Sequence, residues 1–334
     1  MTRILEVKRL SVDIPVPAGT LHAVQEVSLH VDRGETLAIV GESGCGKSLT
    51  SLALMGLLPR HAKRTAQRLT LDGEDLQAKR EYAMADIRGN RMAMIFQEPM
   101  TSLNPAYTIG DQLAEPLQRH KRASAAEARD RAVEMLEKVG ITAAASRLSQ
   151  YPHQLSGGLR QRVMIAMALM CNPGLVIADE PTTALDVTIQ AQILHLLADL
   201  QREFDAGLLL ITHDLGIVAR VADRIAVMYA GQIVETGTAQ QIFKAPSHPY
   251  TQGLLDCIPV PGKTPPGAHL GSIPGVVPSL VGAFEGCHFA DRCAHVRPAC
   301  RTAPVSLREV APGHAYRCVL SPEETAAHRP GAAA

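Results

Sequence analysis

Residues 41–48 read Gly41-Glu42-Ser43-Gly44-Cys45-Gly46-Lys47-Ser48 and match the pattern G-x-x-x-x-G-K-[ST]. In this pattern backbone N–H groups close around phosphates, the lysine adds a positive charge, and the last hydroxyl can bind Mg²⁺. Residues 36–40 predict a buried strand, and residues 49–58 predict a helix whose N-terminus faces the anion. This context predicts a nucleotide site of a kind that many ATPases, GTPases and kinases share. The predicted contacts are Gly41, Ser43, Gly44, Cys45, Gly46, Lys47, Ser48 and Leu49.

A second motif narrows the class of nucleotide-binding protein. Residues 155–161 read Leu155-Ser156-Gly157-Gly158-Leu159-Arg160-Gln161 and resemble the L-S-G-G-x-x-Q signature of ATP-binding cassette (ABC) ATPases. Ser156 with the backbone of Gly157 and Gly158 would form an anion site at a helix N-terminus. The alternative is a serine N-cap followed by glycines in a turn. The resemblance implies that this loop completes the ATP site of a second cassette, so that the active form is a dimer with two ATP molecules between its subunits.

Two carboxylates stand at the end of the apolar run at residues 175–178. Asp179 is placed to hold the Mg²⁺ shell, and Glu180 can polarise the attacking water. Taken alone, the pair could equally be two solvated acids at a strand end. Its position after the phosphate loop and the signature favours ATP hydrolysis.

Three further residues take their roles only from the resemblance to ABC ATPases. Gln97 matches the Q-loop, where the side chain contacts Mg²⁺ and water and moves with the membrane subunits. Asp186 matches the D-loop, which couples two facing ATPase subunits. His213, at the end of the predicted strand 208–212, matches the switch histidine that contacts the γ-phosphate and steadies Glu180. An isolated histidine or glutamine would otherwise be structural or surface-exposed.

The aromatic residues depart from the family pattern. ABC ATPases commonly stack adenine on an aromatic side chain before the phosphate loop, but this chain has no Phe, Tyr or Trp before Tyr82. Ile14, Ala18 or His22 would line that area instead. We therefore expect weaker selectivity for the base, with phosphate binding retained.

Composition excludes several classes of function. The chain has 334 residues with 33 basic and 33 acidic side chains, so no strong overall field favours nucleic acid or an anionic membrane. No apolar run reaches the roughly 18–20 residues that span a bilayer, and the N-terminus lacks the apolar core of a signal peptide. We expect a cytoplasmic protein that attaches to the inner face of the plasma (inner) membrane through partner subunits.

The alternation of strands and helices predicts an α/β fold, a P-loop NTPase of ABC type. It would combine a mainly parallel sheet with N-terminal antiparallel strands (4–31) and a helical subdomain at about 98–172. Eight prolines fall between residues 246 and 278, where periodicity ends. We predict an ATPase domain at 1–245, an irregular extension at 246–323 and a disordered tail at 324–334. Within the first domain we expect helices at 127–139, 158–171 and 188–203 and a closing hairpin at 226–235.

Three stretches narrow the resemblance further: residues 100–105, 247–255 and 273–278. They resemble the ATP-binding subunits of dipeptide/oligopeptide importers, a family that includes nickel uptake systems. The resemblance implies a second cassette (identical or not), two transmembrane permease subunits and an extracytoplasmic solute-binding protein, and no nucleic acid. Peptides are the expected cargo, with nickel or another small solute as the alternative. A soluble ABC ATPase of translation or DNA repair is a weaker alternative, because this chain lacks a second cassette and a coiled-coil insertion.

Four of the seven cysteines lie close together in the sequence: Cys287, Cys293, Cys300 and Cys318. In a reducing cytosol such a group indicates metal binding before disulfides. Paired C-x2-C knuckles typical of structural zinc are absent, and four thiolates suit a [4Fe–4S] cluster, which some members of this importer family carry in the extension. Zinc and unliganded thiols remain the alternatives, and His288 and His295 are competing ligands.

Overall fold

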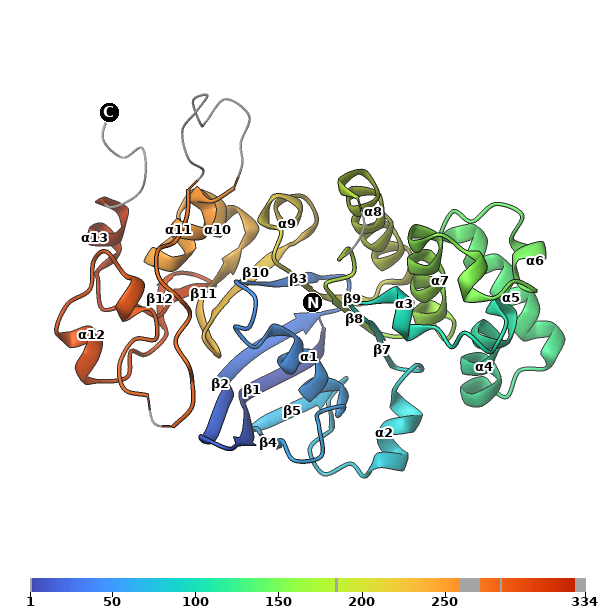
Figure 1. The fold of residues 1–334 in the computed structure, drawn as a ribbon, viewed down its shortest axis with the longest axis horizontal. Coiled ribbons are helices and arrows are strands. Elements are labelled where there is room, and N and C mark those ends of the chain that lie inside the picture. Colours follow the sequence, from blue (N-terminus) through green and yellow to red (C-terminus); the bar gives the residue numbers. More distant parts are fainter. Residues whose placement is uncertain (1, 184–185, 259–270, 283, 328–334) are drawn as a thin grey trace. The chain divides into compact units, whose positions relative to one another are not determined.

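The computed structural model describes residues 2–183, 186–258, 271–282 and 284–327 (Figure 1). The chain divides into two compact units. The first unit comprises Met1–Glu6, His30–Thr36 and Leu69–Ile211. The second comprises Val7–Leu29, Leu37–Arg68 and Thr212–Ala334.

The first unit contains parallel strands β7 (Met92–Ile95), β8 (Leu175–Asp179) and β9 (Gly207–Thr212), in the order β7-β8-β9. Every residue of β8 and β9 is buried, as expected for parallel strands that are covered on both faces. The strands predicted at 175–178 and 208–212 are confirmed. Short strands β5 (Arg68–Leu71) and β6 (Glu74–Asp75) pair antiparallel.

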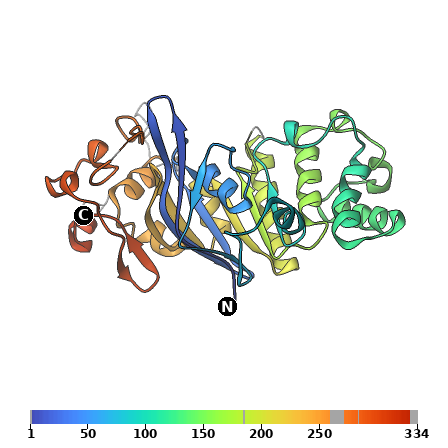
Figure 2. The ribbon, with the colours of Figure 1, turned by 90° about the horizontal axis from the view of Figure 1, so that it is seen from below.

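Helices form much of the first unit, and Figure 2 shows α4 to α7 gathered as one group (green). Ser124 forms a capping box with Glu127 at the start of α5, and Gly140 follows the end of that helix at φ +77°. The helical part of the predicted fold is therefore confirmed, while its boundaries at 98 and 172 stay a prediction. The helices are α2 (Glu81–Ile87), α3 (Pro99–Ser102), α4 (Ile109–Lys121), α5 (Ala125–Lys138), α6 (Ala144–Arg147), α7 (Gly157–Leu169) and α8 (Val187–Phe204), with the 3₁₀ turn η1 (Pro152–Gln154).

The second unit is built on β3 (Thr36–Val40), which pairs in parallel with β10 (Arg224–Tyr229). β10 continues into an antiparallel hairpin with β11 (Gln232–Thr238), so the predicted closing hairpin is confirmed. Helix α1 (Lys47–Met55) follows the phosphate loop and ends at Gly56, whose φ of +68° allows a left-handed C-cap. The other helices here are α9 (Leu215–Val221), α10 (Ala239–Lys244) and α11 (Pro249–Asp256).

The N-terminal strands are long and antiparallel, as predicted. β1 (Arg3–Val16) and β2 (Gly19–Asp32) are neighbours joined by two residues, a connection that returns the chain directly. Their alternating apolar side chains, such as Val27, Leu29 and Val31, are buried. Strand β4 (Lys63–Thr65) pairs antiparallel with β1.

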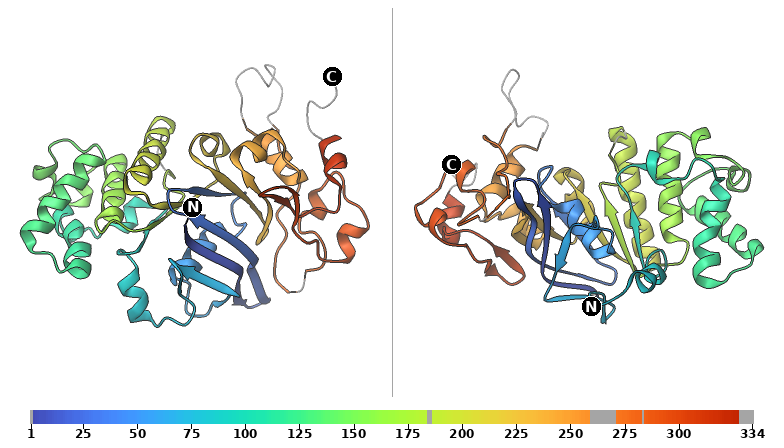
Figure 3. Two further views of the ribbon diagram at one scale, coloured as in Figure 1. Left: turned by 180° about the vertical axis from the view of Figure 1, so that it is seen from behind. Right: turned by 60° about the horizontal axis from the view of Figure 1, so that its bottom comes forward.

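The extension is less irregular than predicted. Strand β13 (His314–Tyr316) pairs with β11 and β12 (Arg308–Ala311) pairs with β13, so the extension adds two strands to the hairpin (Figure 3, red beside orange). Two short helical turns, η2 (Ala290–Arg292) and α12 (Ala299–Thr302), lie between α11 and β12 in the sequence. Helix α13 (Pro322–Ala327) contradicts the prediction of disorder for residues 324–327. Gln252 Nε2 donates to Thr325 O (2.9 Å), a contact that no local pattern could reveal. Residues 328–334 lie outside the described residues.

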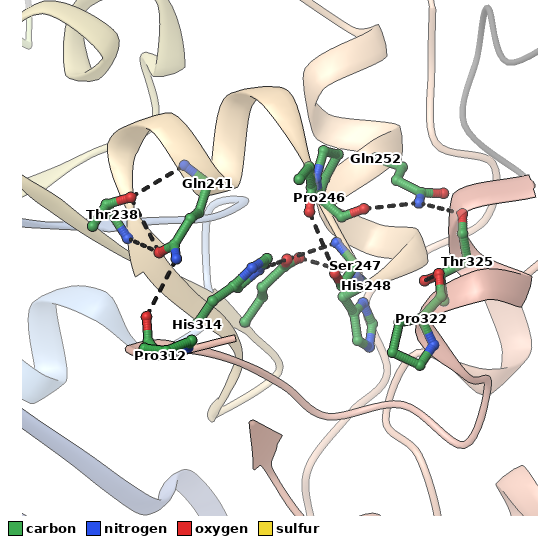
Figure 4. A network of polar contacts seen from close by, with 12 residues as sticks. Thr238, Gln241, Pro246, Ser247, His248, Gln252, Pro312, His314, Pro322 and Thr325 are labelled. Carbon is green, nitrogen blue, oxygen red and sulfur yellow. Dashed lines mark hydrogen bonds and ion pairs between the residues drawn. The ribbon is translucent and has the colours of Figure 1, made fainter. Parts of the chain in front are cut away.

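One buried carboxylate joins three elements of the second unit, and Figure 4 labels its partners Ser247, His248 and His314. Glu235 on β11 is fully buried and accepts the backbone N–H groups of Ser247 (2.6 Å) and His248 (2.9 Å) at the start of α11. The His314 ring of β13 reaches the same carboxylate through Nε2 (2.8 Å). Burial lowers the pKa of His248 to about 4, so that ring is neutral in the folded protein. Glu235 thus holds both α11 and β13 against β11.

Candidate functional site

The phosphate loop connects β3 to α1 and needs glycine at two tight positions. At Gly41, a Cβ would lie 2.1 Å from the backbone oxygen of Met228. At Gly46, φ is +105° and a Cβ would lie 2.5 Å from the backbone oxygen of Ala23. Any larger residue would push the loop off its neighbouring strands. The helix N-terminus and the open loop backbone at Ser43 and Gly44, which are exposed, can therefore receive an anion.

Lys47 is buried and its ammonium lies inside the curve of the loop. Its Nζ donates to Gly41 O (2.8 Å) and Glu42 O (3.0 Å). Cys45 is also buried, and burial raises the pKa of its thiol, which stays protonated. Ser48 and Leu49 are half-buried in the first turn of α1. Lys47 is thus the group of the loop that can supply positive charge to a bound phosphate.

Two residues that sequence reasoning missed support this loop. The Glu42 N–H donates to the Tyr250 hydroxyl (2.9 Å), and the Glu42 carboxylate pairs with Arg292 (2.6 Å). Tyr250 belongs to the stretch 247–255, whose sequence indicates the importer family but not a contact with the phosphate loop. No local signal identifies Arg292, because it lies 250 residues from Glu42 in the sequence.

The carboxylates at the end of β8 differ in their surroundings. Asp179 is buried, whereas Glu180 is half-buried and has φ +44°, a left-handed conformation that is uncommon for a residue with a side chain. The Glu180 N–H donates to Ile211 O (2.9 Å). Its Oε2 accepts from Thr183 Oγ1 (3.0 Å) and from Gln97 Nε2 (3.2 Å). The structure therefore brings together Gln97 and Glu180, two predicted site residues that are 83 positions apart.

The signature and D-loop residues stand at helix N-termini of the first unit. Ser156 is the N-cap of α7 and accepts the Leu159 N–H (3.4 Å), while Gly157 and Gly158 open the helix. Asp186 is the N-cap of α8 and accepts the Ile189 N–H (2.9 Å). Both polar side chains are exposed, so capping leaves them open to solvent.

The predicted switch histidine lies in the second unit. His213 follows β9 directly, and its side chain is exposed. The next residue, Asp214, caps α9 by accepting the Ile217 N–H (3.2 Å). The strand end predicted for this histidine is therefore confirmed, and its role in hydrolysis stays a prediction.

Comparison with known proteins agrees with these motifs. The family described as ABC transporter matches residues 24–183, and the oligopeptide/dipeptide transporter C-terminal region matches residues 234–300. The oligopeptide transport ATP-binding protein AppD of Bacillus subtilis is 49% identical, over 98% of this chain and 99% of its own length. The chain belongs to the ATP-binding proteins of ABC transporters. It is an ATPase whose family couples ATP hydrolysis to transport.

Two further proteins resemble this ABC ATPase. The dipeptide transport ATP-binding protein DppD of Bacillus subtilis is 53% identical over 90% of this chain and 89% of its own. A solved dimer of the ATP-binding cassette MJ0796 bound to ADP and Pi has a TM-score of 0.63 and 28% identity. The match covers 70% of this chain and 98% of the MJ0796 chain. The predicted fold of a P-loop NTPase of ABC type is confirmed.

The four cysteines of the extension influence one another but do not form a metal-binding group. Burial, with smaller contributions from neighbouring cysteines of the set, raises the pKa of the Cys287 and Cys293 thiols to about 11. Cys293 Sγ accepts the His295 N–H and Cys300 Sγ the Arg297 N–H, both at 3.4 Å. Within the described ranges, however, no group of three or more His, Cys, Asp or Glu residues could hold a metal ion. The predicted [4Fe–4S] cluster and the zinc alternative therefore lack support from this geometry.

His288 is not placed as a competing ligand. Its ring is buried, and its Nδ1 lies 2.7 Å from Ala230 O, which requires Nδ1 to carry the proton. Burial lowers the pKa of His288, which keeps the ring neutral. This histidine anchors the extension to the end of β10 instead.

Among the helices that the structure describes, none is long and apolar enough to cross a membrane.

Proposed function

We propose that this ABC ATPase is the motor subunit of an importer of di- or oligopeptides. The support is the match to the oligopeptide/dipeptide transporter C-terminal region and the printed roles of relatives such as AppD and DppD. Nickel, the alternative cargo, has no such support among these relatives. The chain does not contact the cargo in this proposal, and its task is to convert ATP hydrolysis into movement of the permease.

The observation that carries the catalytic proposal is the hydrogen bond from Gln97 Nε2 to Glu180 Oε2 (3.2 Å). We assign Glu180 as the base that orients and activates water, with Asp179 and Ser48 as ligands of Mg²⁺ beside the ATP phosphates. Lys47 compensates phosphate charge. Gln97 would contact the Mg²⁺ and water, and its bond to Glu180 links the Q-loop to the carboxylate directly. His213 would contact the γ-phosphate. When bound, Mg²⁺ neutralises charge that develops on the phosphates.

A second cassette, identical or homologous, completes the site in this proposal. Ser156, Gly157 and Gly158 lie at the N-terminus of the 13-residue helix α7, where N–H groups and the helix dipole favour an anion. They would close over the ATP of the partner, and Asp186 would meet the partner across the dimer. Cassettes solved as dimers support this assembly.

The permease would dock on a hollow beside α4. This hollow of about 560 Å³ is lined by Tyr107, Asp111 and Glu115 together with Ser102 and Met167. Tyr107 is 57% exposed, and two acidic side chains favour a permease segment with basic residues. Docking here, a few residues after Gln97, would hold the ATPase at the cytoplasmic face of the inner membrane and transmit movement to the Q-loop.

Transport itself tests the proposed cargo. Cells that express this chain with its permease and binding protein are expected to take up labelled di- and tripeptides, and a Glu180→Gln variant is expected to abolish that uptake. A Glu137→Gln variant, which changes an exposed glutamate of α5, should transport normally. Uptake of nickel but not of peptides would refute the peptide assignment. A tagged chain that co-purifies with ribosomes or DNA instead of membrane proteins would refute the importer assignment.

The four cysteines are the candidate ligands of a structural [4Fe–4S] cluster. The donor set supports this: four thiols in one small segment, with backbone N–H groups donating to at least Cys293 and Cys300. Its contribution would be to hold together a segment that has little apolar core of its own.

Anaerobic purification with iron, sulfide and zinc analysis tests the cluster. We expect a coloured protein with iron and sulfide in equal amounts, and a Cys300→Ser variant that loses both. Cys257→Ser is the matched control, because Cys257 lies outside the set. A colourless, iron-free protein would refute the cluster, and stoichiometric zinc would replace it.

A further inference from the structure

Glu42 places a negative charge in the loop that binds phosphate. Its carboxylate is 30% exposed and lies in the loop whose backbone must receive an anion. A negative charge at this place repels phosphates unless it is neutralised. Lys47 contacts only the Glu42 backbone oxygen (3.0 Å), so the loop itself contributes no direct partner for this carboxylate among the described contacts.

Arg292 of the extension supplies that partner. Its Nη1 lies 2.6 Å from Glu42 Oε2 and its Nη2 lies 3.0 Å from Glu42 Oε1, a two-pronged pair. The guanidinium side chain is only 4% exposed. A bidentate pair with an almost completely buried guanidinium fixes the direction of the carboxylate and compensates its charge better than an exposed ion pair does.

The Arg292 side chain is itself held in place by its surroundings. Its Nε donates to Pro274 O (2.8 Å) and its Nη2 to Ile273 O (3.0 Å). The guanidinium also lies over the Tyr229 ring, 5.7 Å from the centroid. Because the position of Arg292 is determined by the extension and by β10, it can determine the position of Glu42.

We propose that Arg292 is a positioning residue of the ATP site, which neutralises Glu42 and turns it away so that the phosphate loop accepts a triphosphate. The Tyr250 hydroxyl accepts the Glu42 N–H (2.9 Å) and Arg292 holds the carboxylate, so the extension grips this loop residue at both backbone and side chain. Arg292 directly precedes Cys293, and folding of the cysteine segment therefore presents the guanidinium to the loop. The extension thus contributes to the affinity of the phosphate loop for ATP. This inference depends on ATP binding by the phosphate loop.

A charge cycle at the two positions tests this role. We measure the dissociation constant of a fluorescent ATP analogue for the full chain carrying Arg292→Gln, Glu42→Gln, or both. The local charge changes by −1, +1 and 0 in these variants. From the Coulomb energy of unit charges at protein-surface distances, we expect Arg292→Gln to bind the analogue on the order of tenfold more weakly than wild type. Glu42→Gln should bind it severalfold more tightly, and the double variant within about twofold of wild type. Added salt should shrink the first two differences.

The control is Arg301→Gln, which removes an exposed ion pair with Asp291 (2.6 Å) in the same segment and should leave the affinity unchanged. Affinity that falls equally in Arg292→Gln and the double variant would overturn the proposal, because a purely structural loss would not be rescued by removing Glu42. If Arg292→Gln does not fold, the affinity of Glu42→Gln for the ATP analogue tests the proposal without it. Unchanged or weaker binding by Glu42→Gln would overturn the proposal. Arg292→Lys, which keeps the charge but loses the two-pronged contact, should bind ATP more weakly than wild type and more tightly than Arg292→Gln.

Discussion

Replacing Glu180 by Gln is expected to lower the ATPase rate by about 10²- to 10⁴-fold, the usual contribution of a positioned general base. The amide has nearly the same shape but cannot accept a proton from water. Hydrogen bonds to Thr183 and Gln97 can persist with an amide, and the Glu180 backbone bond to Ile211 is untouched, so the site keeps its form. ATP binding should therefore continue, and the variant should accumulate ATP-bound dimers.

Steady-state ATPase rates measured together with ATP affinity separate these effects. A base that acts only on the chemical step lowers kcat and leaves the dissociation constant of ATP nearly unchanged. Glu137→Gln is the matched control, because it makes the same chemical change at an exposed position of the same unit. Wild-type turnover in Glu180→Gln would show that another group activates water.

Replacing Glu235 by Gln is expected to lower the free energy of unfolding by about 3 kcal/mol, because one buried carboxylate serves three buried donors. The Ser247 and His248 N–H groups and the His314 ring all point at its two oxygens, and Gln offers a single acceptor oxygen for them. The amide NH₂ of Gln would face donors instead of acceptors. For a chain of this size the loss corresponds to a melting temperature lower by roughly 5–10 °C.

Thermal unfolding of Glu235→Gln and of Glu285→Gln compares a buried carboxylate with an exposed one in the same unit. The second variant should melt within about 1 °C of wild type, as surface substitutions usually do. A His314→Ala variant should be less destabilised when Glu235 is already replaced, because the two residues share one interaction. A Glu235→Gln protein as stable as wild type would show that this network does not hold α11 and β13.

Elements whose patterns are local were predicted well. The buried strand at 36–40, the strands at 175–178 and 208–212, and the hairpin at 226–235 all appear within about three residues of their predicted ends. The helix after the phosphate loop was also correct, although it begins at Lys47 and ends at Met55 where Gly56 turns the chain. Each of these signals depends on neighbours in the sequence, such as apolar runs, glycines and capping residues.

The extension was predicted less well because its order comes from distant contacts. Proline-rich sequence with no periodicity indicated irregular chain, yet residues of β13 pair with β11, and α13 is held by Gln252. These elements are short, and short helices and strands have little stability of their own. Their order depends on docking against β11 and α11, and a local sequence pattern cannot reveal such contacts.

The sequence by itself determined the chemistry of this ATPase, because each motif that carries it consists of a few consecutive residues. These motifs are the phosphate loop, the signature and the paired acids at the end of β8. Tertiary structure alone decided how that chemistry is supported. Gln97 meets Glu180 across 83 residues, and Arg292 meets Glu42 across 250. Such pairs depend on where the fold returns the chain, which is set by packing of the whole core. The phosphate loop is therefore recognisable from eight residues, while the reason that an acid is tolerated within it lies in the extension.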